Sequence, residues 1–134
     1  MLFKPELAIK IVNGQKTETR RWTPHIPISV GKTFYAQLKM FDTDSRFALL
    51  KAVNVYKWNP LDITQAIAKA EGFDTPADFS KAFQAINAHK SLKTKSGKLR
   101  THWAVEFEVV HLILTPALPA ELKTAIKTEL EKGI

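Results

Sequence analysis

The sequence predicts an α+β fold in which a small β-sheet curls into a partial barrel surrounded by helices. Two observations support this fold class. The predicted elements follow the order helix, strands, two helices, strand and helix, and no repeat, heptad pattern or linker divides them. The strands are too few for a β-sandwich, and helices are inserted between them, which favours a single α+β domain over residues 1–134.

The first predicted elements are a helix and two strands. Pro5 and Gly14 bracket a helix over residues 5–13, since proline favours the first helical position and glycine follows the last one. A turn then leads into a strand over residues 33–40. After a hairpin connection, a long run rich in β-forming residues predicts a second strand over residues 46–58.

Two helices, a strand and a last helix complete the predicted order. Residues 59–62 end the long strand and cap a helix that Gly72 terminates, and Thr75 caps the next helix. Alternating apolar and polar residues predict a strand over residues 102–109. The residues of this strand that we expect to face the core are Trp103, Val105, Phe107 and Val109. An amphipathic helix follows over residues 119–132.

Composition and charge indicate a soluble domain that favours polyanions. The 20 Lys and Arg residues outnumber the 13 Asp and Glu residues, and the net charge of +7 favours nucleic acid ahead of membrane. The chain has no cysteine, no apolar run long enough to span a membrane and no signal-peptide pattern, so we expect a cytoplasmic location. The histidines show no metal-ligand spacing and no nucleotide-binding fingerprint is present, so neither metal nor cofactor is predicted.

A dense cationic segment over residues 14–22 follows the first helix. It combines three cations, two threonine hydroxyls and an indole within a few positions after a glycine. Arginine and lysine donors with threonine hydroxyls suit phosphate oxygens, so we expect this segment to face a ligand. Its candidate nucleic-acid-binding residues are Lys16, Thr17, Arg20, Arg21 and Trp22.

A second basic stretch lies over residues 90–100. It has five cations and no acid, with serine, threonine and glycine between them, which indicates a basic loop. We expect this loop to extend the nucleic-acid-binding surface through Lys90, Lys93, Lys95, Lys98 and Arg100. In an alternative interpretation, the loop belongs to a protein-interaction module that binds acidic partners.

Five aromatic residues are assigned by their neighbours. Trp22 either stacks on a base or packs as a lid over the barrel. Trp58 and Trp103 lie in apolar strand patterns and are predicted to be core residues. Tyr35 and Phe41 are assigned to the core or to the rim of a cleft.

These elements, in this order, resemble the ASCH domain, a branch of the PUA-like superfamily of small β-barrels associated with RNA. The resemblance covers about residues 5–110 and implies a PUA-like curled β-barrel with surrounding helices. It also implies that RNA or a nucleotide is the partner, held in a basic cleft. The segments that carry the resemblance are Ile9 to Arg21, Val30 to Thr33, Ile63 to Phe73 and Trp103 to Phe107.

The resemblance also implies an enzymatic alternative. One bacterial branch of the family hydrolyses the acetyl amide of N4-acetylcytidine, and another ASCH protein is described as a ribonuclease. The lysine, threonine and glutamate of the amidohydrolase branch correspond here to Lys16, Thr19 and Glu71, which are therefore candidate catalytic residues. This chain departs from that branch at Arg21, since an acid usually follows the arginine there.

The chemistry of Lys16 and Thr19 leaves two interpretations open. A threonine hydroxyl needs a base, and a lysine whose pKa is lowered by Arg20, Arg21 or burial supplies one. Residues three apart in a straight strand face opposite sides, so Lys16 and Thr19 converge only if the backbone turns. A straight strand instead aligns Thr17, Thr19 and Arg21 on one face. The other interpretation is a phosphate cradle without catalysis.

Glu71 occupies a position that local helix energetics disfavour. It lies just before Gly72, at the negative end of its helix, where the macrodipole opposes a carboxylate. A residue placed against local stability often has another role. Here it either pairs with a cation across a cleft, activates water, or is a solvated side chain beside Lys69.

Overall fold

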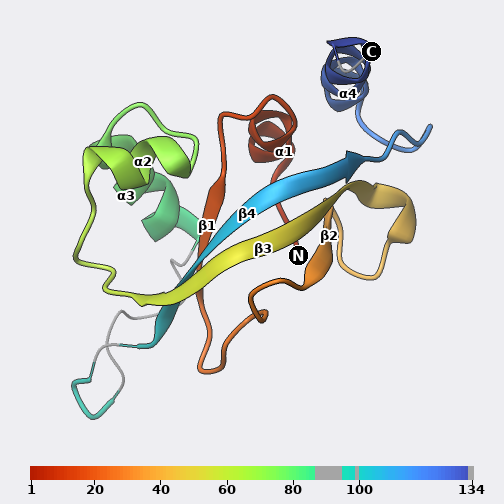
Figure 1. Cartoon of the computed structure of the whole chain (residues 1–134). Coiled ribbons are helices and arrows are strands. Elements are labelled where there is room, and N and C mark those ends of the chain that lie inside the picture. Colours follow the sequence, from red (N-terminus) through yellow and green to blue (C-terminus); the bar gives the residue numbers. More distant parts are fainter. Residues whose placement is uncertain (87–94, 99, 133–134) are drawn as a thin grey trace.

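The computed structural model describes residues 1–86, 95–98 and 100–132, and Figure 1 shows their arrangement. An antiparallel four-stranded sheet in the order β1-β4-β3-β2 forms the centre of the fold. The sheet curls into a half-barrel (Figure 1), which confirms the predicted fold class. The strands are β1 (Glu18–Trp22), β2 (Thr33–Gln37), β3 (Arg46–Trp58) and β4 (His102–Leu112).

Four α-helices surround the sheet in the described part of the chain. Helices α2 and α3 lie together at one end of the sheet, while α4 lies at the other end (Figure 1). The bounds of the helices, and of one 3-10 turn, are α1 (Pro5–Val12), η1 (Thr43–Ser45), α2 (Gln65–Ala70), α3 (Pro76–Ile86) and α4 (Ala120–Lys132). Each helix expected from the sequence is therefore present.

The cap of α2 differs from the prediction. Residues 59–62 form a turn, in which Asp62 N donates to Asn59 O at 2.9 Å, and they do not cap the helix. The cap is Thr64, whose hydroxyl accepts from Ile67 N at 3.2 Å. The expectation was wrong because both segments carry good capping residues, and only the path of the chain selects between them.

Strand β1 was not predicted as a strand, because its residues show no apolar alternation. It pairs with β4 over its whole length, from Glu18 opposite Glu106 to Trp22 opposite His102. Its polar side chains build the site described below, so the strand has no apolar face to bury. Backbone pairing with β4 stabilises it instead. The second half of the cationic segment, residues 18–22, is thus an edge strand of the sheet.

Two bulges in the β3–β4 pair bend the sheet. They lie between Leu49 and Leu50 and between Ala52 and Asn54. Bulges increase local twist and bending, which accounts for the curl into a half-barrel. The residues before α1 then bridge the two edge strands. Leu2 pairs with Gln37, the last residue of β2, and its carbonyl accepts from Arg21 of β1.

The apolar core is divided into two clusters, one at each end of the sheet. The first joins the half-barrel to α1 and α4, through residues such as Ile11, Phe47 and Leu122. The second joins the other end of the sheet to α2 and α3, through Trp58, Phe79, Phe83 and their neighbours. The junction of β1, α1 and α2 lies between them.

The predicted burial of β4 is only partly confirmed. Val105 and Phe107 are buried, as expected, but Val109 is 39% exposed and Trp103 is only half-buried. The bulge opposite Val109 breaks the alternation at that point. Near its start β4 is covered on both faces, since Ala104 packs into the α2–α3 cluster while Val105 is also fully buried.

For Tyr35 and Phe41 the core alternative is wrong, and a position at a rim stays a prediction. Tyr35 is 39% exposed and Phe41 is 95% exposed. Trp58 is buried as predicted. No helix in the described part of the chain is both long and apolar enough to cross a membrane.

Gly72 ends α2 in a conformation that needs glycine, with φ at 95°. A Cβ atom there would lie 3.1 Å from Lys10 Cδ and 3.3 Å from Lys16 Cβ. Gly14 has a similar φ of 83°, but a Cβ atom there would meet nothing within 4 Å. The two glycines therefore separate the cost of the backbone conformation from the cost of crowding Lys16.

We expect Gly72→Ala to lower the free energy of unfolding by about 2–3 kcal/mol, because left-handed strain and overpacking add. We expect Gly14→Ala to lower it by only about 1 kcal/mol, from the backbone term alone. Urea denaturation of both variants measures the difference. Equal losses would show that the contact with Lys16 is not tight.

Candidate functional site

A pocket of about 710 Å³ opens between the two core clusters. This volume is in the range of small-molecule sites. Its apolar wall includes Phe3 from the barrel side and Phe73, Phe79 and Phe83 from the α2–α3 side. Apart from Lys4, the charged and hydroxyl side chains of the lining gather at one place, which we call the polar floor and which consists of Lys16, Thr19, Arg20, Arg21 and Glu71.

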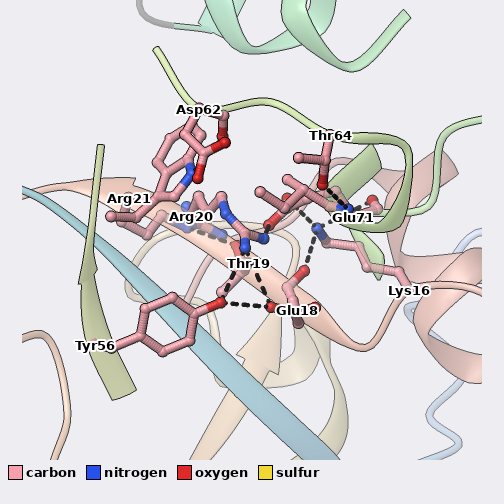
Figure 2. Close-up of polar contacts among 11 residues, drawn as sticks. Lys16, Glu18, Thr19, Arg20, Arg21, Tyr56, Asp62, Thr64 and Glu71 are labelled. Atoms are coloured by element: carbon pink, nitrogen blue, oxygen red, sulfur yellow. Dashed lines mark hydrogen bonds and ion pairs between the residues drawn. The ribbon is translucent and has the colours of Figure 1, made fainter. Parts of the chain in front are cut away.

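The Glu71 carboxylate is the centre of the polar floor. Lys16 Nζ lies 2.8 Å from Glu71 Oε1, and Arg20 Nη1 lies 3.1 Å from Oε2. Figure 2 shows both cationic side chains pointing toward Glu71. All three residues are buried, with exposed fractions of 2%, 5% and 4%. These two pairs offset the unfavourable position of Glu71 at the end of its helix. Because the carboxylate is buried and paired, the interpretation of Glu71 as a solvated glutamate is wrong.

Lys16 is held as an ammonium group by three oxygens. Besides Glu71 Oε1, its Nζ donates to Glu18 O at 2.7 Å and to Glu71 O at 3.2 Å. Three acceptors match the three protons of the charged form. Burial lowers the pKa of Lys16, and Arg21 and Arg20 lower it further, while Glu71 opposes this shift.

Arg20 extends the network to a tyrosine that sequence analysis missed. Its Nη2 donates to Glu18 Oε1 at 3.3 Å and to Tyr56 Oη at 3.1 Å, and Tyr56 Oη donates to Glu18 Oε1 at 3.2 Å. Burial raises the pKa of Tyr56, which keeps the phenol neutral as a donor. The guanidinium also lies over the Trp58 ring, at 5.1 Å. Only the register of β3 against β4 brings Tyr56 here, and no local motif marks it.

Thr19 and Arg21 lie beside each other because β1 is a strand. Arg21 Nε donates to Thr19 Oγ1 at 3.1 Å, and Arg21 Nη2 donates to Leu2 O at 2.6 Å. Burial lowers the pKa of Arg21, and Glu71 opposes this effect. This is the alignment expected of a straight strand. Lys16 still reaches the same pocket, because it precedes the strand and lies where the chain leaves the turn after α1.

Three donor atoms of the polar floor have no acceptor among the described residues, and one of them is Arg21 Nη1, since the two hydrogen bonds of that side chain use Nε and Nη2. The Thr19 hydroxyl accepts a hydrogen bond, but its own proton has no protein acceptor in this part of the chain. Arg20 Nε is buried and is likewise unpaired within the described ranges. Buried donors normally have a partner, but Arg20 Nε is closed off from the pocket. The Thr19 hydroxyl and Arg21 Nη1 belong to side chains that line the pocket, so these two donors are suited to a ligand oxygen.

The other predicted nucleic-acid-binding residues lie outside the polar floor. Thr17 is exposed and does not line the pocket. Trp22 lines it, and the Arg100 guanidinium lies over the Trp22 ring at 5.0 Å. Lys95 and Lys98 are exposed. The remaining predicted residues, Lys90 and Lys93, are outside the described residues.

The described residues include no cluster of three or more His, Asp or Glu side chains that is able to hold a metal ion. The site therefore has to be interpreted from its cations, its carboxylates and its hydroxyl group.

Comparison with known proteins addresses the fold. No family model matches the sequence, and no curated protein matches it either. A crystal structure of an ASCH domain from Lactobacillus crispatus matches 78% of this chain and 70% of its own, with a TM-score of 0.61 and 15% identity. This chain has the ASCH fold. The ASCH fold is PUA-like, so the predicted resemblance is confirmed at the level of structure.

Two further solved structures are similar to this chain. An ASCH protein from Zymomonas mobilis matches 96% of this chain and 92% of its own, with a TM-score of 0.52 and 13% identity. A protein from Enterococcus faecalis, of the family DUF984, matches 84% of this chain and 77% of its own, with a TM-score of 0.59 and 20% identity. At such identities the likeness is one of architecture.

The pKa of Lys16 tests the central pair of the polar floor in this ASCH fold. Glu71→Gln keeps the shape and an acceptor oxygen but removes the charge that raises the pKa of Lys16. We expect this pKa to fall further below the ordinary lysine value, as measured by NMR titration of the side-chain carbon. Glu108→Gln, on the exposed part of β4, is the control. An unchanged pKa in Glu71→Gln would contradict the pairing.

Proposed function

We propose that this chain binds RNA or a nucleotide and holds one nucleoside unit in the pocket. The observation that carries the proposal is that aromatic walls and a polar floor share one pocket of about 710 Å³. Aromatic rings bind a planar base by stacking, whichever of the bases it is. Buried donors at the floor then fix its orientation.

The charge of the floor favours a neutral or singly charged group. Three cations face two carboxylates, those of Glu18 and Glu71, and Lys16 and Arg20 are already paired with them. The unused donors that line the pocket are the Thr19 hydroxyl and Arg21 Nη1. A base carbonyl or a single phosphate oxygen has the acceptors that these donors need.

The phosphate backbone of a longer ligand is expected to contact the surface outside the pocket. The chain carries a net charge of +7, and Lys95 and Lys98 are exposed. Arg100 connects this basic stretch to the pocket, because it lies over Trp22, which lines the pocket. Such contacts release counterions, so affinity falls with salt.

A pocket-filling substitution tests this proposal. Ala82 of α3 lines the pocket, whereas Ala85 on the same helix is exposed and does not line it. We expect Ala82→Phe to weaken binding of a short single-stranded RNA roughly 5- to 150-fold, the effect of losing one stacked base. Ala85→Phe adds the same ring outside the pocket and is expected to bind as the wild type does. Fluorescence anisotropy with labelled RNA measures both.

Two results would argue against RNA in the pocket. One is equal affinity of the Ala82→Phe variant and the wild type. The other is binding that does not weaken between about 50 mM and 200 mM salt, since phosphate contacts require such a loss.

The alternative proposal is a hydrolase of the ASCH type that acts on an acylated cytosine or on RNA. Thr19 supplies the nucleophile, Lys16 the base and Glu71 the acid or water activator. The observation that favours this alternative is the free hydroxyl proton of Thr19 in a pocket shared with Lys16, whose pKa is lowered. With three acceptors around Nζ, the described arrangement is the protonated resting form, and Lys16 has to lose a proton before it accepts one from Thr19.

Isosteric variants test this chemistry without breaking the fold. We expect Thr19→Val to lower kcat for N4-acetylcytidine by about a thousandfold or more, since the nucleophile is lost. Thr17→Val removes an exposed hydroxyl from the same segment and is expected to keep the wild-type kcat. At Glu71 the variant to use is Glu71→Gln and not Glu71→Ala. Alanine would leave the buried cations Lys16 and Arg20 without their partner, which lowers the free energy of unfolding by about 3–5 kcal/mol.

The same variants are assayed for cleavage of short RNA. Turnover that survives in Thr19→Val would exclude this nucleophile. Absence of turnover in the wild type on both substrates would leave the binding function as the interpretation of the site.

A further inference from the structure

The turn between β2 and β3, residues 38–45, is held in one shape by a buried serine. Ser45 is 5% exposed. Its hydroxyl accepts from Lys39 N at 3.0 Å and donates to Asp42 O at 2.7 Å. These bonds cross-link the two arms of the turn, so the residues at its tip are presented by a constrained backbone.

Phe41 lies at this tip in a conformation that neither local sterics nor burial explains. Its φ is 59°, and it is the residue other than glycine with a positive φ in the described part of the chain. Bulky side chains are disfavoured in the left-handed region. Its ring is 95% exposed, so it gains almost nothing from burial in the folded chain. Backbone strain of this kind is concentrated at functional sites.

The turn forms one end of the pocket. Leu38 and Met40 line it, and Met40 is 64% exposed directly before Phe41. At the side of the pocket formed by α3, the lining residues are Phe83 and Ile86, and Ile86 is 46% exposed. The pocket therefore extends from α3 to the residue that precedes Phe41.

The charges around the tip favour a base over a phosphate group. Asp42 and Asp44 follow Phe41 in the turn and outnumber Lys39, the one cation among residues 38–45, so an anionic lipid surface or a phosphate against the ring is disfavoured. A neutral, planar base stacks on an exposed ring without that repulsion. Lys4, an exposed cation that also lines the pocket, is available to the phosphate that connects two nucleotides.

We propose that Phe41 is a stacking platform for an unpaired base next to the nucleoside held in the pocket. The ligand is then a single-stranded segment of at least two nucleotides, and not a free nucleoside. This inference rests on the proposed binding function, which it extends by naming the class of ligand.

Phe41→Asn tests the platform, because asparagine tolerates the left-handed region and the variant is expected to unfold at a temperature no lower than the wild type. We expect its affinity for short oligouridylate, oligoadenylate and oligocytidylate to fall roughly 5- to 150-fold, as for one lost stacking contact. Affinity for cytidine monophosphate is expected to stay at the wild-type value. Phe41→Tyr keeps the ring and is expected to restore binding. Val30→Asn, which removes an exposed side chain away from the pocket lining, is the matched control.

The results separate this inference from the proposal on which it rests. If the wild type binds no oligonucleotide, the binding function fails and the platform with it. If the wild type binds and Phe41→Asn binds equally well, the platform alone is overturned. It is also overturned if the variant loses cytidine monophosphate to the same extent, or if sedimentation shows that the ring mediates self-association of the wild type.

Discussion

The buried contact of Glu71 with Lys16 and Arg20 is the interaction on which the site depends. It joins the end of α2 to the segment just before β1, through Lys16, and to the interior of β1, through Arg20, although the charged groups are 55 and 51 residues apart in the chain. A buried charge without a partner is costly, so neither element is free to move away from the other. Gly72 makes the approach possible, since a side chain there would press against Lys16.

This arrangement changes what the cationic segment offers to a ligand. Lys16 and Arg20 are neutralised by carboxylates inside the fold, and Arg21 is committed to Leu2 O and Thr19. The floor is therefore a fixed set of dipoles and charges with few free donors, and not an open cluster of cations. Such a preorganised surface selects for the position of ligand oxygens more than for total charge. Attraction of a polyanion is left to exposed cations elsewhere on the chain.

The separation of the apolar core into two clusters explains why a pocket exists at this place. The half-barrel packs against α1 and α4, while the other end of the sheet packs against α2 and α3. Charged side chains at the junction keep the two clusters from merging into one core, because apolar side chains offer a charged group no hydrogen-bond partner. The aromatic residues that face the junction, Phe3 and Phe79 among them, supply its walls. One sheet thus provides both the stability of the fold and the opening for a ligand.

The amino-acid sequence by itself determined the class of fold and most elements. Helix caps, glycine stops and apolar periodicity are local signals, and β3 and the helices followed from them within a few residues. It also brought Lys16, Thr19 and Glu71 forward as candidates, through their resemblance to a family motif. Only the tertiary structure decided that residues 18–22 form a strand and that Tyr56 joins the network. Both depend on cross-strand register and burial between distant segments, which leave no periodic trace in the local sequence.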